Sequence, residues 1–358
     1  MSAKYIGKGS FRFETAPKIS AWASAGAAKE ADGPLARYFD YLSDDAYFGQ
    51  STWEKAEAEL HRHTLELALT KAKISVSELG MIFAGDLQNQ CTASSFGSRY
   101  EGVPYFGLYG ACSTFAEAII LAAMAVDGGF IKCGAAAASS HFCSAERQFR
   151  LPLEYGGQRT PTAQWTVTGA GAVVITASDS AIANGGEESA KPKLVQRITS
   201  ATPGIIRDAG IKDAANMGAA MAVAAYETLY QHFEDTGRDP SYYDLIVTGD
   251  LAKIGFDIVT DFFSKSGTEL TNYNDCGLLI YDRETQDVHS GGSGAGCSAS
   301  VLCSYLLNEM RSGAVNKLLF AGTGALMSAI TSGQGESIPG ICHAVSIENF
   351  PEDAGGDQ

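Results

Sequence analysis

The residue with the clearest chemical potential in this chain is Cys112, which follows Gly110 and Ala111 at the start of a predicted helix. A helix N-terminus carries roughly half a positive charge, and this charge stabilises a thiolate relative to a thiol. Small neighbours also let a substrate carbonyl approach the sulfur, so Cys112 is a candidate nucleophile. The alternative is a small buried hydrophobic residue, which is the commoner role of a single cysteine.

The pattern around this cysteine occurs twice at the same spacing. The residues concerned are Cys112, Ser113, Gly128 and Lys132 in the first copy, and Cys297, Ser298, Gly313 and Lys317 in the second. A tetrapeptide that ends in Gly-Asp-Leu precedes each copy, at residues 84–87 and 248–251. The repeat predicts an internally duplicated fold with a ligand site where the halves meet. It also indicates that both cysteines suit a tight helix start.

Predicted helices and strands alternate along the chain. Hydrophobic periodicity and glycine stops indicate helices at 53–72, 113–126, 217–233 and 300–310, and strands at 79–84, 166–176, 243–248, 277–281 and 317–321. Such alternation is typical of largely parallel sheets covered by helices on both faces. The best candidate for a junction between the halves is the glycine- and glutamate-rich segment 180–193.

Composition limits the classes of partner. Of the 358 residues, 45% are hydrophobic and 19% charged, which indicates a globular chain of two domains or one large duplicated unit. The net charge of -15 argues against nucleic acid and against an anionic membrane surface.

The cysteines and acidic residues indicate no metal site. The 8 cysteines form no C-x-x-C pair and no zinc spacing, so we expect reduced, buried thiols. The acidic pairs lack EF-hand spacing and favour solvated surface. The apolar stretch 118–126 is shorter than the ~20 residues of a membrane span, and the first residues lack the apolar segment of a signal peptide.

Several features together resemble the thiolase superfamily, which includes the β-ketoacyl synthases. They are the duplicated halves, the Gly-Ala-Cys-Ser helix start, the Thr-Gly-Ala-Gly-Ala-Val-Val segment at 168–174 and the glycine-rich loop at 291–296. The resemblance implies an α/β thiolase-like fold with two halves stacked in α-β-α-β-α layers, usually as a homodimer. We expect the first half at residues 1–182, the second at 190–345 and a tail at 346–358.

Longer segments are similar, more narrowly, to the stage V sporulation protein AD family of spore-forming bacteria. These segments are residues 29–35, 84–90, 139–141, 145–150, 154–158 and 275–281. The resemblance implies binding of dipicolinic acid (pyridine-2,6-dicarboxylate) and its delivery, with calcium, into the developing spore. It further implies a soluble protein peripherally associated with the forespore or spore inner membrane, with membrane proteins of the same operon as partners.

The chain departs from the catalytic members of the superfamily. Condensing enzymes carry a histidine in the loop after the strand at 245–248, where this chain has Asp250. Thiolases carry a second cysteine where this chain reads Ala-Gly-Thr-Gly at 321–324. His289 lies where thiolases hold a histidine, although an exposed surface histidine fits the sequence equally well. A cysteine without a positioned base and oxyanion donors forms thioesters poorly, so we interpret the site as degenerate.

A ligand with two carboxylates needs matching donors. The run from 139 to 159 supplies Ser139, Ser140, His141, Arg147, Arg150 and Arg159, and arginine can hold a carboxylate through two parallel hydrogen bonds. The N–H groups at Cys112 and Ser113 offer donors for the second carboxylate. The remaining residues of the expected site are Tyr155 or Phe142 for stacking on the ring, and Gly292 and Gly294 of the glycine loop. The alternative for Arg147 and Arg150 is a surface ion pair with Glu146 or Glu154.

The sequence therefore predicts a dipicolinate-binding protein in which Cys112 and His289 occupy vestigial catalytic positions. Two alternatives remain open: an active acyltransferase or condensing enzyme that uses Cys112, and a purely structural dimer. No cofactor is expected besides dipicolinate as ligand, and the sequence leaves open whether calcium enters with it.

Overall fold

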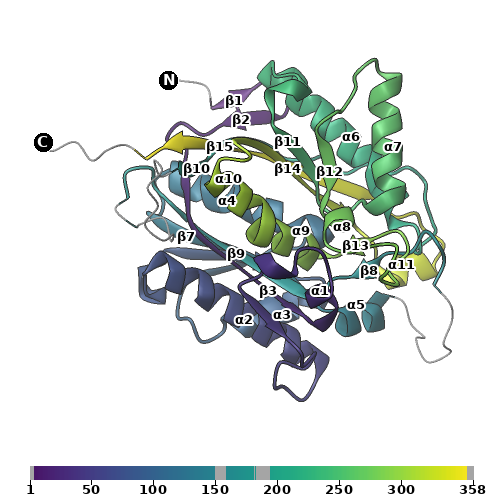
Figure 1. Ribbon diagram of the computed structural model, residues 1–358, viewed down its shortest axis with the longest axis horizontal. Helices are drawn as coiled ribbons and strands as arrows, with labels where there is room; N and C mark the ends of the chain where they lie inside the picture. Colours follow the sequence, from purple (N-terminus) through teal and green to yellow (C-terminus); the bar gives the residue numbers. More distant parts are fainter. Residues whose placement is uncertain (1–3, 150–158, 181, 183–193, 353–358) are drawn as a thin grey trace, which may run out of the picture.

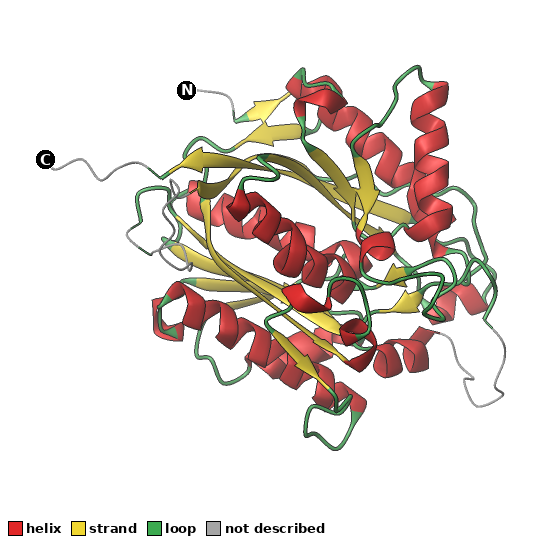
Figure 2. Ribbon diagram, viewed as in Figure 1, coloured by secondary structure: helices red, strands yellow, loops and turns green. Residues whose placement is uncertain are grey.

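The computed structural model describes residues 4–149, 159–180, 182 and 194–352. Its elements lie in five layers (Figures 1 and 2), with helices outside two curved groups of strands and further helices between them. The strands of the first half are β3 (Lys18–Ala27), β4 (Tyr41–Ser43), β5 (Met81–Gly85), β6 (Tyr105–Gly107), β7 (Cys133–Ser140), β8 (Trp165–Thr166) and β9 (Gly169–Thr176). Its helices are α1 (Ala28–Ala31), α2 (Trp53–Ala72), α3 (Thr92–Ser98), α4 (Thr114–Asp127) and α5 (Phe142–Phe149).

The second half repeats this plan. Its strands are β10 (Leu194–Thr202), β11 (Leu245–Thr248), β12 (Tyr273–Asp275), β13 (Gly292–Ser293), β14 (Lys317–Ala325) and β15 (Gly340–Pro351). Its helices are α6 (Met217–Thr236), α7 (Ala252–Lys265), α8 (Cys276–Leu279), α9 (Ala295–Val301), α10 (Leu307–Ser312) and α11 (Ala329–Gly333), with a π-helical turn at Leu302–Leu306 between α9 and α10.

The strand order confirms the predicted duplication. In the first half the order is β3-β9-β7-β5-β6, with β9 antiparallel to both neighbours and β7, β5 and β6 parallel. The order β10-β15-β14-β11-β12 repeats the same directions. A register irregularity between Ile19 and Ala21 of β3 recurs between Ile198 and Ser200 of β10. The two halves join where β3 and β10 pair antiparallel, at Lys18 and Arg197.

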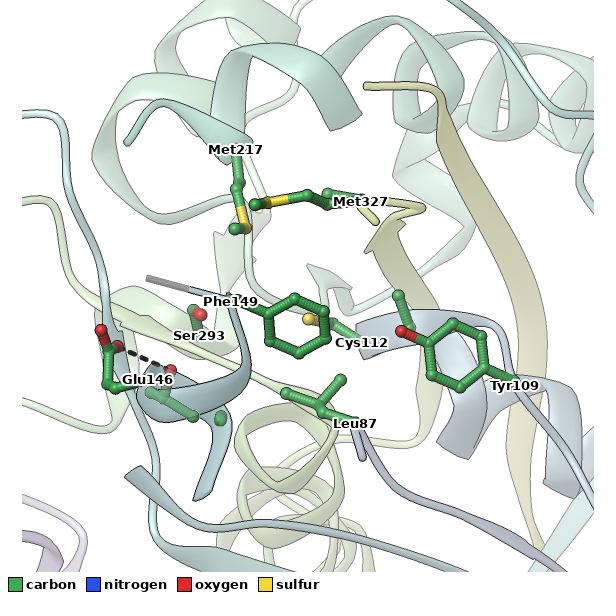
Figure 3. A pocket seen from close by; sticks show the side chains of 12 residues that line it. Leu87, Tyr109, Cys112, Glu146, Phe149, Met217, Ser293 and Met327 are labelled. Atoms are coloured by element: carbon green, nitrogen blue, oxygen red, sulfur yellow. Dashed lines mark hydrogen bonds between the residues drawn. The ribbon is translucent and has the colours of Figure 1, made fainter. Parts of the chain in front are cut away.

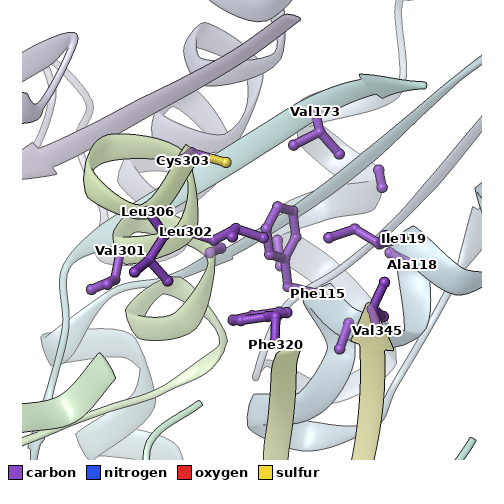
Figure 4. Packing of buried hydrophobic residues seen from close by; sticks show 14 of the residues in the cluster. Phe115, Ala118, Ile119, Val173, Val301, Leu302, Cys303, Leu306, Phe320 and Val345 are labelled. Atoms are coloured by element: carbon purple, nitrogen blue, oxygen red, sulfur yellow. The ribbon is translucent and has the colours of Figure 1, made fainter. Parts of the chain in front are cut away.

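The middle layer is largely buried because most residues of α4 and α9 are apolar or small. In α4 the side chains of Phe115, Ala118 and Ile119 have no exposed surface, and the cluster around Phe115 draws on both halves of the molecule (Figure 4). A helix that is apolar all round belongs in the interior. A Cβ on Gly171 of β9 would lie 2.2 Å from the carbonyl oxygen of Ala299, so glycine lets α9 lie close to the sheet.

Three sequence expectations need correction. Residues 277–281 were predicted as a strand, but residues 277–279 lie in helix α8, which begins at Cys276 because the Asp275 side chain accepts the Gly277 N–H at 2.9 Å and caps the helix. The helix predicted from residue 300 begins at Ala295. The tail predicted from residue 346 was wrong up to Pro351, because these residues pair with β10.

The N-terminal residues also cross the expected boundary between the halves. Strands β1 (Tyr5–Ile6) and β2 (Ser10–Arg12) form a hairpin, and β2 pairs with β10 of the second half. Most of the predicted junction lies outside the described residues, so the domain limits stay predictions. Within the described ranges, no helix is long and apolar enough to cross a membrane.

Phe115→Ala should lower the stability of the fold strongly, because it opens a cavity where the helices of the middle layer meet the sheets. Such truncations cost about 3–5 kcal/mol. The control is Phe130→Ala, at a side chain that is 81% exposed, where a change within about 0.5 kcal/mol is expected. Urea unfolding followed by circular dichroism measures both midpoints. Equal shifts for the two variants would contradict the buried position of α4.

Candidate functional site

A cavity of about 30 Å³ lies beside Cys112, between the two halves. Its first-half lining residues are Leu87, Tyr109, Ala111, Cys112, Ala145, Glu146, Phe149 and Thr166. Its second-half lining residues are Met217, Ser293, Ala325 and Met327. The walls are mainly apolar, and the Glu146 carboxylate accepts a hydrogen bond from the Thr166 hydroxyl at 3.2 Å (Figure 3).

Cys112 occupies a tight turn that its neighbours define. Ala111–Ser113 forms a 3-10 turn directly before α4, and Ala111 has a left-handed backbone with φ of 53°. Such a conformation in a residue other than glycine stores strain and is common at functional sites. Gly324 of β14 lets the turn lie against the strand, since a Cβ there would lie 2.3 Å from the Gly110 carbonyl oxygen.

The turn uses most of its own donors. The Ser113 N–H and hydroxyl both donate to the Gly110 carbonyl oxygen, at 3.1 and 2.7 Å. The Gly110 N–H donates to the Thr114 hydroxyl at 3.0 Å. The N–H of Ser113, predicted as a free donor for a carboxylate, is therefore already used inside the turn.

Asp250, in the loop after β11, is the carboxyl group next to Cys112. Its oxygens accept hydrogen bonds from the Gly294 N–H at 2.9 Å and the Thr323 hydroxyl at 2.8 Å, and the Cys112 thiol is a third donor. These donors come from both halves of the fold. The side chain is 1% exposed, and burial raises the pKa of Asp250 to about 6 in spite of the three hydrogen bonds.

Asp275 at the end of β12 holds the loop that carries Asp250. Its carboxylate accepts the N–H groups of Leu251 and Ala252, both at 2.9 Å, and the Thr248 hydroxyl at 2.7 Å. Burial raises the pKa of Asp275 to about 7. The loop is thus fixed by the neighbouring strand, which leaves little freedom to the carboxyl group beside Cys112.

The predicted donors of the Ser-Ser-His segment lie close by but have structural partners. The Ser139 hydroxyl donates to Glu57 at 3.2 Å, and the Ser140 hydroxyl donates to the Val167 carbonyl at 2.7 Å. The Cys143 N–H donates to Nδ1 of His141, so Nε2 carries the proton that is donated to the Ala46 carbonyl at 2.8 Å. Burial lowers the pKa of His141. None of the three serine and histidine side chains lines the described cavity.

The two arginines of this run that the structure describes, Arg147 and Arg159, do not line the described cavity. Arg147 forms an ion pair with Glu54 at the N-terminal end of α2, so its predicted role as a ligand for a carboxylate is not met in this structure. Arg159 donates to the Asp287 carbonyl at 2.8 Å and lies over the Trp165 ring. Arg150 and Tyr155 lie outside the described residues.

The other predicted residues fall into two groups. His289 pairs with Asp287 at 2.9 Å, and Phe142 stacks on Trp165, so neither lines the cavity. Gly292 lies in β13 directly before Ser293, and Gly294 donates to Asp250. The structure therefore brings Cys112 and the glycine loop together at Asp250.

Sequence reasoning missed the residues that form most of the cavity wall. Phe149, Met217 and Met327 come from three separate segments and converge on the cavity (Figure 3). Glu146 was considered only as the partner of an arginine. Nothing in the sequence pairs these positions, because each belongs to a different local pattern.

Comparisons with known proteins agree with the fold. The family described as Stage V sporulation protein AD (SpoVAD) matches residues 7–348. Stage V sporulation protein AD of Bacillus subtilis (strain 168) is 42% identical over 346 residues, which cover 96% of this chain and 98% of that protein.

Solved structures with the same fold are similar over almost the whole chain. The cerulenin-bound OleA of Xanthomonas campestris is 16% identical, with a TM-score of 0.58 over 94% of this chain and 97% of that one. The 3-oxoacyl-[acyl-carrier-protein] synthase III of Aquifex aeolicus VF5 is 16% identical, with a TM-score of 0.53 over 93% and 99%. This likeness confirms the predicted thiolase-like fold and, at such identity, nothing further.

Asp250→Asn should flatten the dependence of stability on pH. The pKa of Asp250 is higher in the folded chain, about 6, than its ordinary value of 3.8, so the folded state holds this proton more tightly. The resulting stability is fully present below about pH 4 and is lost as pH rises through 6; two pKa units are worth on the order of 3 kcal/mol. Melting temperatures between pH 5 and 8 measure this loss.

The matched control is Asp261→Asn on α7, where the carboxylate is exposed and pairs with Lys265. This variant should follow the parent at every pH. If Asp250→Asn also follows the parent, the pKa of Asp250 is not raised in the folded chain.

Proposed function

Because the chain belongs to the stage V sporulation protein AD family, we propose that its pocket at Cys112 binds dipicolinic acid. In this proposal the protein supports the uptake of dipicolinate and calcium into the developing spore. The pocket descends from the active site of a thiolase-like enzyme and no longer performs acyl transfer.

The hydrogen bond between Cys112 and Asp250 carries the proposal. A thiol becomes nucleophilic through a positive neighbour or a base strong enough to take its proton, and here its neighbour is a carboxyl group whose pKa of about 6 makes it a weaker base than a thiolate. A full negative charge at hydrogen-bond distance opposes thiolate formation more than the half charge of the α4 N-terminus favours it. Asp250 also takes the N–H of Gly294, so that donor is not free for an oxyanion.

The charge of the cavity favours a neutral form of the ligand. Among its described lining residues, Glu146 is the only carboxylic acid and none is Lys, Arg or His. The 1:1 calcium chelate of dipicolinate carries no net charge, so its binding needs no cation from the described lining residues. Calcium takes oxygen ligands, and Glu146, Thr166 and Ser293 present such oxygens at the cavity. We therefore propose that the calcium chelate is the form bound, with calcium as part of the cargo.

We further propose that the protein works at the forespore or spore inner membrane beside the membrane proteins of the same sporulation operon. It would present dipicolinate to these partners as a peripheral binding component. The apolar walls of the cavity support such a role, since Leu87, Met217 and Met327 suit the faces of an aromatic ring.

A homodimer through the edge strand β6 is the proposed assembly. Strand β6 lies at the end of the first-half strand order, and an unpaired sheet edge favours pairing with a second copy. The nearby side chains of Phe96, Tyr100 and Phe106 are 55%, 81% and 49% exposed. Exposed aromatic groups of this kind are typical of protein contacts.

The purified protein should bind the calcium chelate of dipicolinate in a calorimetric titration, and Cys112→Trp should abolish binding by filling the cavity. Cys112→Ser should bind within about twofold of the parent, because the thiol forms no bond with the ligand. Met124→Trp, on the exposed face of α4, is the control and should bind normally.

Normal binding by Cys112→Trp would place the ligand elsewhere, and a parent without binding would refute the function. A stable acyl adduct on Cys112 after incubation with acyl-coenzyme A, seen by mass spectrometry, would instead support the acyltransferase alternative.

Phe106→Glu should convert the dimer into a monomer, because it puts a charge in the centre of the proposed contact. Sedimentation velocity at micromolar concentration distinguishes the two masses. The control Phe130→Glu changes an exposed phenylalanine beyond the far end of α4 and should remain dimeric. A parent that sediments as a monomer would contradict the proposed assembly.

A further inference from the structure

The cavity at Cys112 is too small for any ring-shaped ligand as it stands. Its volume of about 30 Å³ admits roughly two water molecules, at ~10–15 Å³ for each. A second cavity of about 440 Å³ lies immediately outside it and is within the usual range of small-molecule sites, roughly 300–1,000 Å³. Both cavities are lined by Tyr109, Phe149 and Met327, so they meet at these side chains.

Phe149 stands at this junction. Figure 3 shows its ring between Leu87 on one side and Met217 and Met327 on the other, and Cys112 lines the same cavity. The ring thus fills a flat slot between apolar walls. Removing it from the slot would connect the outer cavity with Cys112.

The position of Phe149 allows this movement. It is the last residue of α5 and is partly exposed, whereas Leu87 and Met327 are 6% and 7% exposed. Rotation of a partly exposed side chain is rapid. The two methionines are unbranched and adapt readily to a change in their neighbour.

We infer that Phe149 is the specificity-determining residue of this site, because its ring occupies the slot that the aromatic ring of a ligand takes. When the Phe149 side chain turns toward the outer cavity, the flat six-membered ring of the ligand takes the place of the phenyl ring between Leu87 and the two methionines. The polar groups of such a ligand then face Cys112, Glu146, Thr166 and Ser293 at the inner end. The class of ligand selected is a planar aromatic carboxylate. The identity of that ligand rests on the proposed function. The closure of the slot by the Phe149 ring is independent of that function.

Alkylation of Cys112 tests the closure without any ligand. Phe149→Ala should raise the rate at which iodoacetamide modifies Cys112 by about tenfold or more, measured by peptide mass spectrometry over time. Phe130→Ala, at an exposed phenylalanine far from the cavity, should leave the rate unchanged. Cys133 and Cys297 are buried away from the cavity and serve as internal references within the same chain.

The alkylation rates of Cys133 and Cys297 distinguish local opening of the cavity from unfolding of the chain. Faster modification of Cys112 alone supports the inference. An unchanged rate at Cys112, or an equal acceleration at Cys133 and Cys297, would overturn it. Phe149→Leu keeps an apolar side chain but not a flat ring, and it should give an intermediate rate at Cys112.

Ligand discrimination tests the selectivity. In the parent, the calcium chelate of dipicolinate should protect Cys112 from iodoacetamide, and an aliphatic dicarboxylate with calcium should not. Phe149→Ala should lose this discrimination by admitting both. Equal protection by both ligands in the parent would overturn the role in specificity. If dipicolinate gives no protection while Phe149→Ala still accelerates alkylation, the proposed function fails and the closure by Phe149 stands.

Discussion

The hydrogen bonds of the buried carboxyl group of Asp250 are the constraint on which the site depends. They join the start of α4, the start of α9 and strand β14, which belong to different halves of the chain. A buried carboxylate must be satisfied by such donors, since leaving it unpaired costs several kcal/mol. The placement of the halves around the pocket and the position of the Cys112 thiol therefore follow from the same contacts. A change that freed Cys112 for catalysis would also disturb the junction of the halves.

The two halves share one plan, but their repeated residues have different roles. Asp86 and Asp250 follow equivalent strands, yet Asp86 bonds within its own half, to the N–H groups of Gln88 and Ser94. Cys297 has no exposed surface, whereas Cys112 borders the cavity. The duplication supplies the frame, and the cavity lies at the first of the two helix starts, where Cys112 borders it, and not at the second, where Cys297 is fully buried.

The distribution of charge explains why Arg147 does not line the described cavity. The Arg147 side chain is long enough to reach the surface, and its charged group is more stable there because it pairs with Glu54 and stays in contact with water. The interior of the site instead contains carboxyl groups whose pKa values burial raises, such as Asp250 and Asp275. Such an interior suits a ligand that arrives with its charge already neutralised.

The sequence alone determined the thiolase-like fold, the duplication, most helices and strands, and the position of Cys112 at a helix start. The thiolase-like fold was implied by the family resemblance and the duplication by the repeated motif. Local chemistry is sufficient for the helices, the strands and the place of Cys112, because periodicity and glycine stops are each read within one segment. Helix α8 was missed because Asp275 caps it and a tight contact of Gly277 with Gly292 fixes it. Only the tertiary structure decided that Phe149, Met217 and Met327 form one wall and that Arg147 turns away from it. The side chains of that wall come from segments far apart in the chain, and long-range packing, which no local pattern records, brings them together.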